Sequence, residues 1–185
     1  MEKLKISDVR KKINFHISEE TTMHYLYKIA EGAYNTTVDF DVYLPSIGKN
    51  LQRDFVWTKE QKSELIISVL KGITLNSLAI ILDKGPRMDS PTVMRIIDGK
   101  QRLSTMLDFY KGLFSISVKG NEYFYEDLEE DAQRLIKYYS FRARTAYEYT
   151  QENEPIADEE KIAWFEMINF AGTPQDAQHL ENLKK

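Results

Sequence analysis

The spacing of apolar side chains along the chain alternates between two periods. Intervals of three and four residues, typical of an amphipathic helix, mark one set of segments, and intervals of two or short unbroken runs, typical of a strand, mark the other. The helix-like segments cover residues 5–18 (weakly), 21–32, 58–72, 99–111, 128–139 and 158–170. The strand-like segments cover residues 37–44, 78–82, 93–97 and 141–149, with a hairpin over 114–125. Because helices and strands alternate, the pattern predicts an α/β or α+β fold in a single domain.

Capping residues indicate where two of these helices begin. Thr58 and Gln61 have the spacing of a capping box, in which each side chain binds a free N–H group at the helix start. Thr173 and Pro174 suit the first positions of a final short helix. We divide the chain into an N-terminal extension (1–20), an α/β core (21–125) and a helical C-terminal part of the same domain (126–185).

The composition narrows the class of protein. The chain has 185 residues, of which 42% are hydrophobic and 12% aromatic, enough to form a core. It contains no cysteine, which excludes disulfides, thiolate metal sites and a cysteine nucleophile. Its apolar runs are too short to span a bilayer, and residues 1–12 lack the apolar stretch of a signal peptide. We therefore expect a cytoplasmic protein with no membrane partner.

The charge is unevenly distributed along the chain. The formal net charge of −4 does not by itself indicate an anionic ligand. However, residues 1–120 carry 18 basic and 14 acidic side chains, whereas residues 121–160 carry 4 and 12. An anionic ligand is therefore expected to bind within the first two-thirds of the chain.

The segment after the predicted strand 93–97 contains the clearest candidate chemistry. Asp98-Gly99-Lys100-Gln101-Arg102 joins this strand to a helix, and the free N–H groups at a helix start attract anions. Two cations at that end oppose the helix dipole, a conflict that a bound phosphate would relieve. Asp98 could then hold Mg²⁺ or orient a water molecule, and Gln101 could position the attacking water. Alternatively, Asp98 only caps the helix and the two cations point into solvent. The P-loop and dinucleotide-binding glycine motifs are absent from the sequence.

Two further segments contain candidate ligand-binding residues. Ahead of the capped helix, Arg53 can pair with a phosphate, and Trp57 or Phe55 can stack on a base. Alternatively, the aromatic residues anchor the helix that follows, and Gln52 and Arg53 are exposed. Asn169 shares a helical face with apolar residues, so it either binds a ligand or holds the turn that follows it.

Together these segments resemble the ParB/sulfiredoxin-like domains at the N-terminus of GmrSD-type modification-dependent restriction enzymes, a family marked by an Asp-Gly-Gln-Gln-Arg motif. The resemblance runs from about residue 21 to the C-terminus. It rests on the order and spacing of Gln52-Arg53-x-Phe55-Val56-Trp57, the helix 60–72, the segment 97–105 and Asn169-x-x-Gly172-Thr173-Pro174. The resemblance implies a mixed sheet with flanking helices. It also implies binding and hydrolysis of nucleoside triphosphates, coupled to control of a nuclease or to sensing of modified phage DNA.

Carried over to this sequence, the resemblance implies catalytic roles for Asp98, Gln101 and Arg102, with Asp98 as the candidate Mg²⁺ ligand. The candidate phosphate- and nucleotide-binding residues are Gln52, Arg53, Gly99, Lys100 and Asn169. Lys100 stands where the family motif has its first Gln. A lysine neutralises phosphate but cannot accept a hydrogen bond, so we expect nucleotide binding to be less affected than hydrolysis.

Three functions follow as hypotheses. The first is a stand-alone regulatory domain that binds nucleoside triphosphates with Mg²⁺, and could hydrolyse them, in a restriction, anti-phage or phage-encoded system, acting with a nuclease or another defence protein. The second is a ParB-like module that binds or nicks DNA, favoured by the positive balance of residues 1–120. The third is a catalytically inactive interaction or decoy protein whose acidic segment 121–160 contacts a partner. A histidine-metal nuclease is not expected, because His16, His24 and His179 lack metal-ligand spacing.

Overall fold

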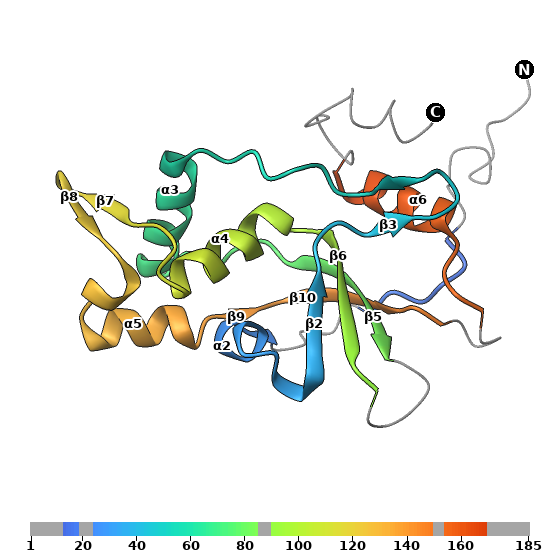
Figure 1. Cartoon of the computed structure of the whole chain (residues 1–185), viewed down its shortest axis with the longest axis horizontal. Helices are drawn as coiled ribbons and strands as arrows, with labels where there is room; N and C mark the ends of the chain where they lie inside the picture. The colour runs from blue at the N-terminus through green and yellow to red at the C-terminus, as the bar shows by residue number, and fades with distance from the viewer. Residues whose placement is uncertain (1–12, 19–23, 85–89, 150–153, 170–185) are drawn as a thin grey trace, which may run out of the picture.

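A four-stranded mixed sheet forms the centre of the fold (Figure 1). The computed structural model describes residues 13–18, 24–84, 90–149 and 154–169. The strands lie in the order β10 (Ala143–Tyr147), β5 (Leu78–Lys84), β6 (Thr92–Asp98) and β2 (Thr36–Asp39). The central strands β5 and β6 are antiparallel, and each outer strand runs parallel to its neighbour. The α+β class with a mixed sheet and flanking helices is therefore confirmed.

Four helices pack together on one face of this sheet. They are α2 (Leu26–Ala30), α3 (Lys59–Leu70), α4 (Lys100–Tyr110) and α5 (Glu130–Lys137). Every second residue of the central strands, such as Ile80 and Ile96, joins these helices in the larger of two apolar cores. The capping box of α3 is present as predicted: Thr58 Oγ1 accepts the Gln61 N–H at 3.4 Å, and Gln61 Oε1 accepts the Thr58 N–H at 3.0 Å. Two reciprocal bonds thus fix the start of α3.

Helix α6 (Asp158–Asn169) packs on the opposite face of the sheet, near the hairpin formed by β3 (Tyr43–Leu44) and β4 (Lys49–Asn50). Trp164 and Phe165 of α6 contribute to a second core together with Ile81 and Ile97 of the central strands. Because both faces are covered, all five residues of β5 from 78 to 82 are buried, which explains the unbroken apolar run in the sequence.

The remaining elements are short. Strand β1 (His24–Tyr25) pairs with β9 (Ser140–Phe141), and β7 (Ile116–Val118) forms the predicted hairpin with β8 (Asn121–Tyr123). Two 3₁₀ helices cover Ala33–Asn35 and Tyr125–Asp127. In Figure 1, β7 and β8 gather with α3, α4 and α5 at the end of the molecule away from α6. Within the described ranges, no helix has the length and apolar character that crossing a membrane requires.

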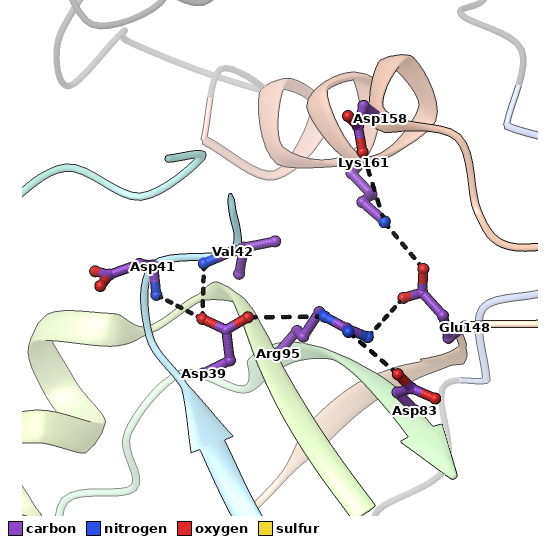
Figure 2. Close-up of polar contacts among 8 residues, drawn as sticks. All are labelled: Asp39, Asp41, Val42, Asp83, Arg95, Glu148, Asp158 and Lys161. Atoms are coloured by element: carbon purple, nitrogen blue, oxygen red, sulfur yellow. Dashed lines mark hydrogen bonds and ion pairs between the residues drawn. The ribbon is translucent and has the colours of Figure 1, made fainter. Parts of the chain in front are cut away.

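A network of ion pairs joins α6 to the sheet (Figure 2). Arg95 of β6 lies at its centre and contacts three carboxylates at 3.7, 3.1 and 3.0 Å, those of Asp39, Asp83 and Glu148. Glu148 also contacts Lys161 of α6 at 3.0 Å, and Lys161 lies 3.7 Å from Asp158. We call these six residues the Arg95 network. It connects three strands of the sheet, and the segment that follows the fourth, to the first turn of α6.

Two predicted elements were wrong where the structure describes them. The strand 37–44 is broken, because Asp39 Oδ1 accepts the N–H groups of Asp41 (3.0 Å) and Val42 (2.9 Å), and Val42 takes a φ of 51°. The chain beyond this turn pairs with β4 instead. Residues 13–18 are not helical, and Ser18 forms a bridge with Thr145 of β10. The predicted helix 21–32 begins later, at Leu26, because His24 and Tyr25 pair with β9 as a strand. The predicted helix starts near residues 5 and 173 lie outside the described residues.

Candidate functional site

The junction between β6 and α4 contains a β-bulge. Ala79 pairs with Asp98 whereas Ile80 pairs with Ile96, so Ile97 is an extra residue in β6. A bulge of this kind bends the strand and re-aims the side chains beside it. Ile97 belongs to the core on the α6 side, and Asp98, immediately after it, lines an open cleft.

Gly99 makes the sharp turn from the strand into α4. It takes a φ of 101°, and a Cβ at this position would lie only 2.3 Å from Leu78 Cδ2. Glycine is therefore required both for the backbone conformation and for the space. Gly99 is the N-cap residue, so no side chain caps the helix, and the first N–H groups of α4 have no intrahelical acceptors.

Arg102 links three parts of the chain at this junction. One nitrogen of its guanidinium lies 2.6 Å from Asp98 Oδ2, and another donates to the carbonyl oxygens of Asn76 and Ser77, the latter at 3.3 Å. Its side chain is only 16% exposed. Asp98 therefore forms an ion pair rather than the helix cap of the alternative interpretation, and Arg102 fixes the segment that enters β5.

Tyr139 also holds the segment that enters β5. Its hydroxyl oxygen accepts the N–H group of Leu75 at 2.9 Å. Burial raises the pKa of Tyr139, and the Leu75 N–H together with the positive charges of Arg102 and Arg142 partly oppose that rise. The phenol is thus neutral at ordinary pH and acts as a hydrogen-bond acceptor for the backbone.

Lys100 does not point into solvent. Its Nζ lies 2.7 Å from Asp41 Oδ1, and the Lys100 side chain is 10% exposed whereas that of Asp41 is 59% exposed. The turn at Asp39 that breaks the predicted strand presents Asp41 to this lysine. The positive charge of Lys100 is therefore matched inside the protein before any ligand arrives.

Gln101 holds the segment 51–57 against the start of α4. Its Oε1 accepts the N–H groups of Val56 (3.1 Å) and Trp57 (3.3 Å), and its Nε2 donates to the carbonyl oxygen of Asp54 (3.3 Å). Both acceptor positions of the amide oxygen are therefore occupied. In this arrangement Gln101 holds the segment in place through its side-chain amide.

Gln52 and Asn169 approach the junction from two other elements. Gln52 Nε2 donates to the carbonyl oxygen of Ile97 at 2.5 Å, next to the bulge. Asn169, at the end of α6, is half-buried, and its Nδ2 donates to the carbonyl oxygen of Phe165 at 2.9 Å. The turn that the sequence assigned to Asn169 lies outside the described residues.

These elements enclose one cleft of about 630 Å³. The residues that line it are Gln52, Arg53, Trp57, Asn76, Ser77, Leu78, Ala79, Asp98, Gly99, Lys100, Gln101, Arg102, Arg144, Phe165, Ile168 and Asn169. All eight site residues proposed from the sequence are among them, although they come from three separate segments. Trp57 lines the cleft, whereas Phe55 does not and instead lies under Lys62, whose Nζ is 4.3 Å from the ring centroid.

The cleft is strongly basic. Four of its lining residues are cations, Arg53, Lys100, Arg102 and Arg144, whereas Asp98 is the acidic one. Arg144, Asn76 and Ser77 line the cleft but are not among the residues predicted from the sequence. The alternating pattern over 141–149 placed Arg144 on the polar face of a strand, but the order of the strands, which brings it to the cleft, is not visible in the sequence.

The cleft has few ligands for a metal ion. In the part of the chain that the structure describes, no group of three His, Cys, Asp or Glu side chains could hold a metal. Asp98 has one oxygen paired with Arg102, and its other oxygen has no hydrogen-bond or ion-pair partner among the described residues. A single carboxylate fits Mg²⁺ only when the ion arrives with phosphate oxygens as further ligands.

Comparison with known proteins gives the family. Residues 40–183 match the model of the GmrSD restriction endonuclease, N-terminal domain, a range that includes every residue lining the cleft. Comparisons with curated proteins and with solved structures gave no match. Since the matched range covers most of the 185 residues, the chain belongs to the GmrSD restriction endonuclease N-terminal domain family.

Proposed function

We propose that the chain binds a nucleoside triphosphate in the cleft, as the nucleotide-responsive module of a restriction or anti-phage system. One observation carries the proposal: eight residues from three separate sequence segments converge on a cleft whose described lining contains four cations and one acidic group. Membership of a family of restriction endonuclease N-terminal domains supports this setting and makes a nuclease the expected partner.

In this proposal the phosphates lie at the start of α4. The uncapped helix end supplies N–H groups, and the sharp turn at Gly99 brings this end to the cleft. Arg53 and Lys100 add positive charge to the same cleft. An apolar part of the lining, formed by Trp57, Phe165 and Ile168, suits a base or a sugar. The cleft thus offers both kinds of surface that a nucleotide requires.

Mg²⁺ would accompany the phosphates rather than occupy a cage of protein ligands. In nucleotide sites this ion is usually held by one or two carboxylates together with phosphate oxygens. Asp98 is the acidic residue in the lining, and Arg102 fixes its orientation through the 2.6 Å ion pair. Bound Mg²⁺ would neutralise phosphate charge, and this chain's part is to offer the free oxygen of Asp98.

Binding, rather than rapid hydrolysis, is the activity that this arrangement favours. Hydrolysis needs a group that orients the attacking water. The oxygen of Gln101 already accepts two backbone N–H groups, and Lys100 is held by Asp41. We therefore expect a slow or absent turnover beside measurable binding.

Isothermal titration calorimetry tests the proposal, with ATP, GTP, CTP and UTP each titrated with and without MgCl₂. We expect at least one of the four to bind, and Mg²⁺ to strengthen its binding. Arg102→Ala should abolish the signal, whereas Arg142→Ala, which removes an exposed arginine outside the cleft, should retain it. Circular dichroism must show that both variants are folded.

Two results would contradict the proposal. The first is the absence of heat, and of any nucleotide-dependent rise in melting temperature, for all four triphosphates. The second is binding to a duplex oligonucleotide that weakens steeply with salt while no triphosphate binds, which would favour the DNA-binding hypothesis instead.

A further inference from the structure

Arg144 belongs to a row of paired residues on three neighbouring strands, and this row lines the cleft. Arg144 of β10 pairs with Ala79 of β5, and Ala79 pairs with Asp98 of β6. Paired residues on neighbouring strands share a face, and strands lie about 4.8 Å apart, so the Cα atoms of Arg144 and Asp98 are about 10 Å apart. All three residues line the cleft. The cleft therefore extends across β5 to the edge strand.

The charge of Arg144 is not neutralised within the part of the chain that the structure describes. Lys100 and Arg102 each face a carboxylate, at 2.7 and 2.6 Å, and both are largely buried. Arg144 is exposed and has neither an ion pair nor a side-chain hydrogen bond to any described residue. An exposed cation that lines a cleft and faces no carboxylate is available to pair with a bound anion.

We propose that Arg144 is a second anion anchor of the cleft, which binds a phosphate group of the ligand at the β10 end while the start of α4 binds another. The inference rests on the proposed nucleotide binding and specifies which ligands the cleft prefers. Ala79, the smallest side chain in the row, separates the two anchors, so the ligand lies across β5 between them. A guanidinium binds two phosphate oxygens at once, which gives orientation as well as affinity.

This arrangement favours polyphosphates over monophosphates. A triphosphate carries phosphate groups along a chain and can reach both anchors, whereas a nucleoside monophosphate satisfies one. The contribution of Arg144 should therefore be large for a triphosphate and small for a monophosphate. A general effect of positive charge would instead scale only with the net charge of the ligand and would not depend on where on β10 the arginine stands.

The test compares three variants by calorimetry, with MgATP, MgGTP, inorganic tripolyphosphate and AMP as probes. Arg144→Ala should weaken binding of the triphosphate that binds the wild type by about ten- to a hundredfold, the loss expected for a charge-assisted hydrogen bond. Arg144→Lys, which keeps the charge but loses the fork of donors, should give an intermediate loss. Arg142→Ala removes the same charge from a position two residues away that does not line the cleft, and should change affinity less than twofold.

The outcomes separate this inference from the proposal beneath it. If the wild type binds a triphosphate and Arg144→Ala binds it equally well, the second anchor is wrong and the proposed function stands. If Arg144→Ala and Arg142→Ala lose affinity equally, the effect is that of the general field, and the anchor is again wrong. If the wild type binds none of the probes, the proposed function fails first. A melting temperature of Arg144→Ala equal to that of the wild type confirms that its loss of affinity is not a loss of fold.

Discussion

The molecule contains two clusters of charged side chains on the α6 side of its sheet, and they are built in opposite ways. In the Arg95 network, two cations are surrounded by four carboxylates, and every member has at least one partner within 3.7 Å (Figure 2). Among the described residues that line the cleft, four are cations and one is a carboxylate, and Asp41, outside the lining, pairs with Lys100. Helix α6 joins the two, because Lys161 lies in the network and Asn169 lines the cleft.

The difference indicates what each cluster does. Charges that are matched within the chain contribute to the folded state, since their partners are present whether or not a ligand is bound. Charges in surplus around an open cleft do little for the fold, and their field attracts an anion. We therefore expect substitutions in the first cluster to change stability, and substitutions in the second to change binding.

The largest effect is expected at Arg95. Arg95→Met would leave Asp39, Asp83 and Glu148 close together without their shared cation. Removing one partner from a largely buried ion pair costs about 3 kcal/mol, because the remaining charge is poorly solvated. Urea unfolding should show a loss of that size for Arg95→Met. Arg134→Met, at an exposed position of α5, is the control and should change the unfolding free energy by less than about 0.5 kcal/mol. A loss at Arg95 no larger than at Arg134 would remove the distinction between the clusters.

Arg102 is the member of the cleft that should behave partly like the Arg95 network. It neutralises Asp98 and binds two backbone carbonyl groups, so Arg102→Ala leaves three acceptors without their donor. Hydrogen bonds to charged groups are worth about 2 kcal/mol, and we expect a loss of about that size in unfolding free energy. Arg102→Lys should recover part of it through Asp98 alone. If Arg102→Ala is as stable as the wild type, Arg102 contributes to ligand binding and not to the stability of the fold.

The sequence predicted the members of the cleft better than their partners. The residues of the junction, Asp98 to Arg102, were predicted because a helix start, a glycine and nearby cations point to the same chemistry. Arg53 was proposed as a cation, Asn169 as an amide on an apolar helical face, and Gln52 from the family resemblance. Their partners depend on tertiary packing. Asp41 reaches Lys100 only because the Asp39 side chain competes with the strand for backbone N–H groups, a local choice that an alternating pattern conceals.

Arg144 illustrates the other limit of sequence reasoning. Its strand was predicted, but nothing in the sequence shows that β10 lies next to β5 rather than at the opposite edge. Arg144 pairs with Ala79 across 65 residues of chain, and Ala79 pairs with Asp98 across 19, so only the folded structure brings Arg144 into line with Asp98. The same holds for the Arg95 network, whose six members come from five separate elements or their flanks.

A smaller loss of stability is expected at Lys100, because its partner, Asp41, is more than half exposed to solvent. Lys100→Gln separates the pair with Asp41, but Asp41 is 59% exposed and can be rehydrated when the lysine is gone. We expect a loss of about 1 kcal/mol in unfolding free energy, less than at Arg102. A double-mutant cycle with Asp41→Asn measures the coupling directly. A coupling near zero would mean that Lys100 is available to the ligand, and phosphate release by Lys100→Gln would then show whether the family's glutamine restores hydrolysis.

The smallest change in stability is expected at Arg144, where the prediction for binding is large. Arg144→Ala removes an exposed cation that has no partner among the described residues. Its unfolding free energy should stay within about 0.5 kcal/mol of the wild type. The measurement is most informative when repeated with saturating MgATP or MgGTP, whichever binds. A ligand that binds only the folded state stabilises it in proportion to the logarithm of its concentration over Kd, so the wild type should gain more than Arg144→Ala at the same concentration. Equal gains in stability would mean that Arg144 does not contribute to ligand binding.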